Sequence, residues 1–225
     1  ALRPGTIAAE VAVVATAGTT AVASIDPLPE VAALCRGMAL SPQAVLLAPA
    51  FFEGGRYTVG DTHWVEQRGE LVPAAATEGA RDPDFGYRSS DLRAWVEEKT
   101  RGAVSASEVA SIPLELVRGG GVEAVAAALR EACARPGGWT LGRVVVVNAA
   151  CYEDLDVVAL AASRVESEGF RLVYRCAASF VKARGAFSDK PLLRGPDLLE
   201  RPGPGLVLVG SYVHRTTRQL DALLA

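Results

Sequence analysis

Four consecutive valines, Val144–Val147 in the segment GRVVVVNA (142–149), limit more than any other feature what this chain can fold into. β-Branched side chains favour extended backbone, and an unbroken apolar run is typical of a strand that is buried on both faces. Strands of that kind occur in parallel sheets whose two faces are covered by helices. The run therefore predicts an α/β protein.

Strand-like and helix-like segments alternate on both sides of this run. The helix predicted at 152–169 has acidic residues in its first turn and Gly169 just past its end, as helices prefer. Such alternation predicts right-handed crossovers and a three-layer, mostly parallel, doubly wound sheet. The predicted strands are residues 43–50, 109–116, 142–149, 170–175 and 205–210, and the predicted helices are residues 121–138, 152–169 and 177–185.

The first hundred residues have a less regular pattern. The segments HWVEQ (63–67) and ELVPA (70–74) flank Arg68-Gly69, which predicts a β-hairpin flap that stands off the main sheet. Residues 5–18 have a helix-like pattern. A further helix is predicted over residues 90–100, with a cap from Ser89 or Ser90 and an inward stripe of Leu92, Trp95 and Val96.

Composition and charge exclude several classes of partner. The formal net charge is −3 and there is no basic cluster, so we expect no nucleic-acid partner. No apolar run approaches the ~20 residues of a membrane helix, so we expect no membrane partner. The first ten residues lack the basic-then-apolar order of a signal peptide, and we expect a cytoplasmic location. The sequence leaves homo-oligomerisation open. Four cysteines without CxxC spacing are predicted to be buried thiols: Cys35, Cys133, Cys151 and Cys176.

The sequence carries no catalytic motif that can be recognised from residue types and spacing. The two histidines, His63 and His214, are too few for a histidine-built zinc site, and we expect no protein-built metal site. The G-x-S-x-G elbow, the phosphate-binding P-loop and the G-x-G-x-x-G fingerprint are all missing. Three glycines in RGGGVEAV (118–125) precede a predicted helix and could bind an anion, although a tight strand-to-helix turn explains them more simply.

Arginines in predicted loops and at strand ends are the remaining candidates for a binding site. A guanidinium presents a planar fork of donors that matches a carboxylate or a phosphate. The residues concerned are Arg56, Arg81, Arg88 and Arg175.

Several motifs, in the expected order, resemble the four-carbon acid sugar kinases. LLAPAFFEGGRYTVGDTHWV (46–65) and TEGARDPDFGYRSSDL (77–92) are similar to that family's middle region. LRPGTIAAEV (2–11) is similar to the tail of its Asp-Ser-x-Leu-Arg-Gly motif. YRCAASFVKARGAF (174–187) and LVLVGSYVHRTTRQLDALL (206–224) also resemble members, the latter at the Gly-Ser segment where a second lobe begins.

The resemblance implies ATP-dependent phosphorylation of a threonate-like, erythronate-like or oxo-tetronate-like acid, with Mg²⁺. By the same resemblance, Arg3, Arg56, Arg81 and Arg175 hold the acid or the transferring phosphoryl group, and Asp82 bonds to hydroxyls or orients the substrate. Gly210 and Ser211 contact ATP, with Thr216 and Thr217 nearby. No catalytic base is assigned.

The chain departs from the family pattern at several places. The Asp-Asp-x-Thr-Gly segment is missing, Pro4 separates Arg3 from Gly5, residues 18–40 match no family motif, and the glycine-rich ATP loop is absent. We therefore expect a partial chain, inactive by itself: a sugar-acid-binding domain over residues 1–188, a linker or long loop over 189–204, and the start of a nucleotide-binding domain over 205–225.

Two other functions fit the sequence less fully. The main alternative is a non-catalytic module that binds a sugar acid for sensing or for a separate partner. A nucleotide-dependent oxidoreductase on a Rossmann-like sheet would rest on fold analogy alone, because the glycine fingerprint is missing.

Overall fold

The computed structural model describes residues 15–16, 41–82, 86–135, 142–191, 208–210 and 214–225. The chain divides into two units, residues 1–186 and residues 187–225. The second unit contains helix α7 (His214–Leu224). None of the helices that the structure describes is both long enough and apolar enough to cross a membrane.

The centre of the first unit is a parallel sheet of five strands in the order β1-β8-β2-β7-β6. The valine run forms β7, and β2 lies between β7 and β8 with all of its residues buried. The predicted parallel sheet is thus confirmed. The strands are β1 (Ala15–Thr16), β2 (Ala44–Ala48), β6 (Ala110–Ile112), β7 (Arg143–Val147) and β8 (Leu172–Cys176).

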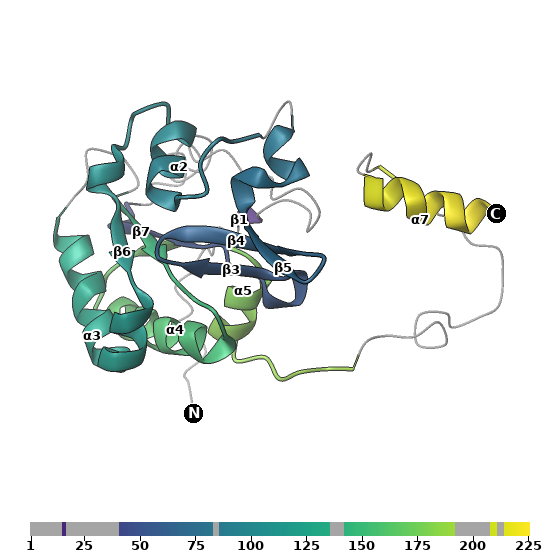
Figure 1. The fold of residues 1–225 in the computed structure, drawn as a ribbon. Coiled ribbons are helices and arrows are strands. Elements are labelled where there is room, and N and C mark those ends of the chain that lie inside the picture. The colour runs from purple at the N-terminus through teal and green to yellow at the C-terminus, as the bar shows by residue number, and fades with distance from the viewer. Residues whose placement is uncertain (1–14, 17–40, 83–85, 136–141, 192–207, 211–213) are drawn as a thin grey trace. The chain divides into compact units, whose positions relative to one another are not determined.

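Helices cover the sheet from both sides, which gives the predicted three layers (Figure 1). Side chains alternate along β2: Leu46 packs with α3, α4 and α5, whereas Val45 and Leu47 pack with α2 on the other face. The predicted inward residues of α2, Leu92, Trp95 and Val96, are buried there. The helices are α2 (Leu92–Lys99), α3 (Leu114–Ala134), α4 (Tyr152–Ser167) and α5 (Ala178–Arg184).

A second, antiparallel sheet forms the predicted flap. The strands β3 (Arg56–Val59), β4 (Thr62–Gln67) and β5 (Glu70–Pro73) pair in sequence order. The turn at Arg68-Gly69, where both residues have positive φ, confirms the predicted hairpin. The sequence pattern did not predict β3. Short 3₁₀ segments complete this region: η1 (Phe52–Gly54), η2 (Ala74–Ala76), η3 (Glu78–Arg81) and η4 (Ala106–Glu108).

Three predicted elements differ from the structure. Within the segment 5–18, Ala15–Thr16 form strand β1 instead of a helix, because a short apolar run fits either structure and pairing with β8 decides it. The strand predicted over 109–116 ends at Ile112, since Pro113 cannot donate to a sheet ladder and is the N-cap residue of α3, which begins at Leu114. Of the strand predicted over 205–210, residues 208–210 have no regular structure, and Leu208 is 85% exposed without a partner strand among the described residues.

Two local predictions at helix starts are also corrected. The glycines of RGGGVEAV lie inside α3, and only Gly121 leaves helical geometry, with φ 59° and ψ −159°. They form a kink between two helical stretches and no strand-to-helix turn. The side chain that caps α2 is Asp91, which accepts from the Ala94 N–H, and neither Ser89 nor Ser90 does so. Asp91 immediately precedes the first helical residue, where a cap has to lie.

Candidate functional site

The carboxyl ends of the central strands bring several loops together. The Ala177 N–H after β8 donates to the Ala48 carbonyl of β2, and the Asn148 N–H after β7 donates to the Ile112 carbonyl of β6. Loops at this edge of an open α/β sheet are where ligands bind in such folds. The candidate site therefore lies at this edge of the sheet, under the flap that adjoins it.

The flap is attached directly to this edge of the sheet. Thr58 of β3 and Ala149 exchange two backbone hydrogen bonds, of 3.0 and 2.9 Å. The turn between β3 and β4 is attached as well: the Asp61 N–H donates to Asn148 Oδ1 at 2.8 Å, and Asn148 Nδ2 donates to Asp61 Oδ1 at 2.7 Å. Thr58 lies in β3 and Asp61 in the Gly60-Asp61 turn that follows it, so both the strand and the turn are attached to the sheet.

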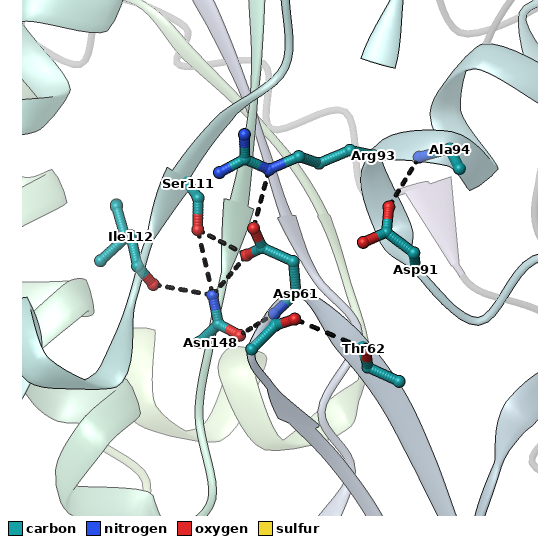
Figure 2. A network of polar contacts seen from close by, with 9 residues as sticks. Asp61, Thr62, Asp91, Arg93, Ala94, Ser111, Ile112 and Asn148 are labelled. Carbon is teal, nitrogen blue, oxygen red and sulfur yellow. Dashed lines mark hydrogen bonds and ion pairs between the residues drawn. The ribbon is translucent and has the colours of Figure 1, made fainter. Parts of the chain in front are cut away.

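Further partners of Asp61 come from β6 and α2 (Figure 2). Ser111 of β6 donates its hydroxyl to Asp61 Oδ1, and Arg93 of α2 donates to Asp61 Oδ2 at 2.7 Å. Asn148, which is fully buried, also donates to the Ile112 carbonyl at 3.1 Å. Asp61 thereby joins the flap, the sheet and α2, so the flap strands hold a defined position over the sheet.

The inner face of the flap carries Arg56 and His63. Residues opposite each other in an antiparallel pair point to the same face, and the register pairs Arg56 with Val65 and Thr58 with His63. Thr58, His63 and Val65 are all buried, which identifies this face as the inner one. The Arg56 guanidinium is half-buried and donates to the Gly54 carbonyl at 3.3 Å. Burial lowers its pKa from the ordinary value.

Arg175 approaches the same region from the main sheet. Alternation along β8 places Tyr174 and Cys176 against α3, α4 and α5, so Arg175 points to the face covered by α2. There it is only 2% exposed, and its guanidinium carbon lies 5.2 Å from the centre of the Trp95 ring. The Trp95 indole N–H is buried and has no hydrogen-bond acceptor among the described residues.

His63 lies within the field of both arginines. Burial, followed by the positive charge of Arg56 and more weakly that of Arg175, lowers the pKa of His63 to about 4, although a hydrogen bond with the Tyr57 backbone acts in the opposite direction. Its Nδ1 lies 3.2 Å from the Thr58 hydroxyl. At neutral pH the imidazole is thus uncharged beside two guanidiniums. We call Arg56, His63, Trp95 and Arg175 the donor cluster.

Among the residues that the structure describes, it brings together two of those predicted to bind the acid. Arg56 and Arg175 belong to the donor cluster, while Arg81 is exposed at the end of η3 and Asp82 follows it. His63 was not predicted as a site residue, although the alternation HWV in β4 marks it as inward-facing. Other predicted residues lie elsewhere: Arg88 is exposed, Gly210, Thr216 and Thr217 belong to the second unit, and Arg3 and Ser211 fall outside the described residues.

Metal ligands do not gather in the described part of the chain. No group of three or more His, Cys, Asp or Glu side chains there could hold a metal ion. Mg²⁺ in phosphoryl transfer commonly takes one or two carboxylates together with substrate phosphates and water, so the donor cluster, which contains no carboxylate, does not fit that ion. Of the cysteines, Cys133 and Cys176 are buried thiols as predicted, and Cys151 is half-buried.

Comparison with known proteins identifies the family of this fold. The model of the family described as the sugar-binding N-terminal domain matches residues 4–184. The chain belongs to this family. The resemblance to the four-carbon acid sugar kinases is confirmed at the level of the sugar-binding domain. None of the curated proteins compared with the chain matches it.

Two solved structures share the fold of the sugar-binding domain. The Haemophilus influenzae protein HI1011, which carries the DUF1537 family model, has a TM-score of 0.52 and 18% identity, over 70% of this chain and 33% of that chain. A Salmonella typhimurium LT2 protein, described as a "putative tRNA synthase", has a TM-score of 0.51 and 20% identity, over the same shares of 70% and 33%. The chain thus spans about a third of the length of both proteins.

Proposed function

We propose that this chain is the sugar-acid-binding part of an ATP-dependent kinase for four-carbon acids of the threonate or erythronate type. The observation that carries the proposal is the donor cluster. It combines two guanidiniums, a neutral imidazole and a buried indole N–H that lacks an acceptor among the described residues. A buried donor without an acceptor is costly, and a carboxylate supplies up to four acceptor positions.

The charges at the cluster favour an acid over a neutral sugar. Arg56 has no carboxylate partner among the described residues, yet it is partly desolvated. A ligand carboxylate would form charge-assisted hydrogen bonds with it in surroundings that exclude much of the water. The uncharged His63 can form a hydrogen bond with a hydroxyl either as donor or as acceptor. The cluster therefore suits a small molecule that carries a carboxylate and a hydroxyl on neighbouring carbons.

In this proposal the chain positions the acid, and a nucleotide-binding lobe supplies ATP with its Mg²⁺. Protein groups in phosphoryl transfer chiefly position the substrate and neutralise charge. Support for the kinase comes from the resemblance to the four-carbon acid sugar kinases and from the shared fold with a DUF1537 protein. The alternative of a binding module without catalysis predicts the same acid affinity but no ATP turnover.

Isothermal titration calorimetry of the 225-residue chain with threonate and erythronate tests the binding step. Arg56→Ala should weaken acid binding by about 1.5–3 kcal/mol, the range for hydrogen bonds to charged groups. Arg171→Ala is the matched control, because Arg171 is an exposed arginine just before β8, at the opposite edge of the sheet. Equal affinities for wild type and Arg56→Ala would contradict the proposed site, provided that both proteins keep the same melting temperature.

A further inference from the structure

A second polar cluster lies at the same edge of the sheet, on the face covered by α4 and α5. It consists of Glu53 in η1, Tyr152 at the start of α4, and Ser179 and Lys182 in α5. These residues follow the carboxyl ends of three neighbouring strands, β2, β7 and β8. We call them the Glu53 cluster. It takes no part in the donor cluster described above.

Hydrogen bonds fix the carboxylate of Glu53. Tyr152 donates its phenol to Glu53 Oε1, and Ser179 donates its hydroxyl to Glu53 Oε2 at 3.2 Å. Ser179 is fully buried and in turn accepts the Phe52 N–H at 3.1 Å. The hydroxyl of Ser179 thus accepts one hydrogen bond and donates another, and it serves to orient Glu53. An otherwise flexible, exposed glutamate is thereby held in one position at the edge of the sheet.

The surroundings of Glu53 keep it charged and leave acceptor positions open. The bond from Tyr152, followed by smaller effects that include Ser179 and Lys182, lowers the pKa of Glu53 against the opposing effect of burial. A carboxylate has about four acceptor positions, and the bonds from Tyr152 and Ser179 take one position on each oxygen. The ammonium of Lys182 lies 3.9 Å from the centre of the Tyr152 ring. A positive charge so close disfavours binding of a second cation, so neutral donors such as hydroxyls are the better match.

The Glu53 cluster and the donor cluster share one short loop. Phe51 and Arg56 exchange two backbone hydrogen bonds, of 2.9 and 2.8 Å, which close the loop from 51 to 56. Glu53 points from this loop toward α4 and α5, whereas Arg56 lies on the inner face of the flap. Phe52 further ties the loop in place by ring contacts with Tyr57 and Tyr152, with centroids 5.9 and 5.0 Å apart. An acceptor group and a donor group thus flank the same turn.

We propose that Glu53, oriented by Tyr152 and Ser179, accepts hydrogen bonds from the distal hydroxyls of the polyhydroxy acid whose carboxylate binds at Arg56. This inference rests on the proposed function and adds to it the part of the site that binds the hydroxyls of the substrate. Glu53 is then a specificity-determining residue that distinguishes a polyhydroxy acid from a simple carboxylic acid of equal length.

Calorimetry with two acids on the 225-residue chain tests the assignment. The probes are threonate and 2-hydroxybutyrate, which has the same four-carbon chain but lacks the hydroxyls on carbons 3 and 4. Glu53→Gln keeps the shape and the bond from Tyr152 but removes the charge. We expect it to weaken threonate binding about tenfold or more and to change 2-hydroxybutyrate binding less than twofold. Tyr152→Phe removes the hydrogen bond that Tyr152 donates to Glu53. It should weaken threonate binding less than Glu53→Gln does, and should again change 2-hydroxybutyrate binding little.

Two controls separate this role from a structural one. Glu131→Gln removes the same charge from the last turn of α3, where Glu131 pairs with exposed Arg135, and should leave both affinities unchanged. Arg56→Ala should weaken both acids alike. An equal effect of Glu53→Gln on the two acids, or none, would overturn the role of Glu53 and leave the acid site at Arg56 standing. Failure of the wild type to bind either acid would overturn the proposed function and this inference together.

Discussion

At the level of single residues, successive side chains of a strand point to opposite faces of the sheet, and this alternation decides which polar residues become buried. Arg175 follows Tyr174 in β8, so it has to face α2, and there it is 2% exposed against the Trp95 ring. Burying a guanidinium is unfavourable unless other groups replace its lost hydration. The contact with the Trp95 indole replaces part of the lost hydration, because the face of the ring attracts a cation. Arg175 thus brings a buried positive charge close to His63 on this face of the sheet.

His63 should make the stability of the chain depend on pH. Its pKa is about 4 in the folded chain against an ordinary value of 6.5. Between these values the unfolded chain binds one more proton than the folded chain, so the free energy of unfolding falls as the pH falls from 6.5 to 4. The expected loss is about 3 kcal/mol, and above pH 6.5 His63 contributes no pH dependence.

Urea unfolding of wild type and His63→Gln between pH 4 and 7.5 measures this contribution. The difference in unfolding free energy between the two proteins should shrink steadily below pH 6.5 and stay constant above it. Parallel curves over the whole range would show that His63 is charged or solvated in the folded chain. The comparison cancels the other titrating groups, since both proteins share them.

The sequence indicated the arginines but not their arrangement. Arg56 and Arg175 were predicted from residue type and from the family resemblance, and the structure places both near His63. No local pattern reveals that a residue of β3 and a residue of β8 meet, because their proximity depends on how the flap docks. Likewise Glu53 lies in a recognisable motif, but its partners Tyr152 and Ser179 come from segments about a hundred residues further along.

Among the secondary-structure elements, the loop from 51 to 56 depends on a glycine. Gly55 has φ +64°, and a Cβ there would lie 2.8 Å from Glu66 Cβ. Gly55→Ala should therefore add a steric cost of about 1–3 kcal/mol to the strain of a left-handed backbone, and should weaken acid binding. Gly60→Ala is the matched control, because Gly60 has φ +61° with nothing within 4 Å of its added Cβ.

Thermal unfolding and calorimetry distinguish the two glycine variants. Gly60→Ala should show only the backbone strain, about 1–2 kcal/mol, and should keep its affinity for acids. Gly55→Ala should lose more stability and should bind threonate more weakly, since Gly55 separates Glu53 from Arg56. Equal losses of stability in the two variants would show that Glu66 moves aside at little cost.

Predictability differed between elements for physical reasons. β2, β7, β8 and α4 were recognisable because long apolar runs or a capped amphipathic pattern fix their type without help from distant residues. β3 was missed because RYTV follows two glycines and gains its strand geometry from pairing with β4 and from docking on Ala149. The short strand β1 likewise depends on β8 for its hydrogen bonds.

For the protein as a whole, the two faces of the sheet hold the two halves of the proposed site. The donor cluster lies between the sheet and the layer of α2 and the flap, and the Glu53 cluster lies beside α4 and α5. The loop from 51 to 56, which leaves the buried central strand β2, connects them. A short polyhydroxy acid bound across this loop would engage both clusters, whereas a simple carboxylic acid would engage only one.

The kinase proposal predicts a specific role for Ser211, which lies outside the described residues. A Gly-Ser segment ahead of a helix offers backbone N–H groups and a hydroxyl suited to phosphate or ribose. In the chain joined to a nucleotide-binding lobe, Ser211→Ala should raise the KM for ATP and change the melting temperature little. A lost cap would instead cost about 1 kcal/mol of stability and leave the KM unchanged.

Coupled ADP release with threonate, erythronate and their oxo-derivatives measures this effect. We expect turnover only when both ATP and a four-carbon acid are present, and a raised KM for ATP in Ser211→Ala. The 225-residue chain by itself should show no measurable ATP affinity, because the family's glycine-rich ATP loop is absent from its sequence. Tight ATP binding by this chain would show that the nucleotide site lies elsewhere. Acid binding without any ADP release from the joined protein would favour the non-catalytic binding module.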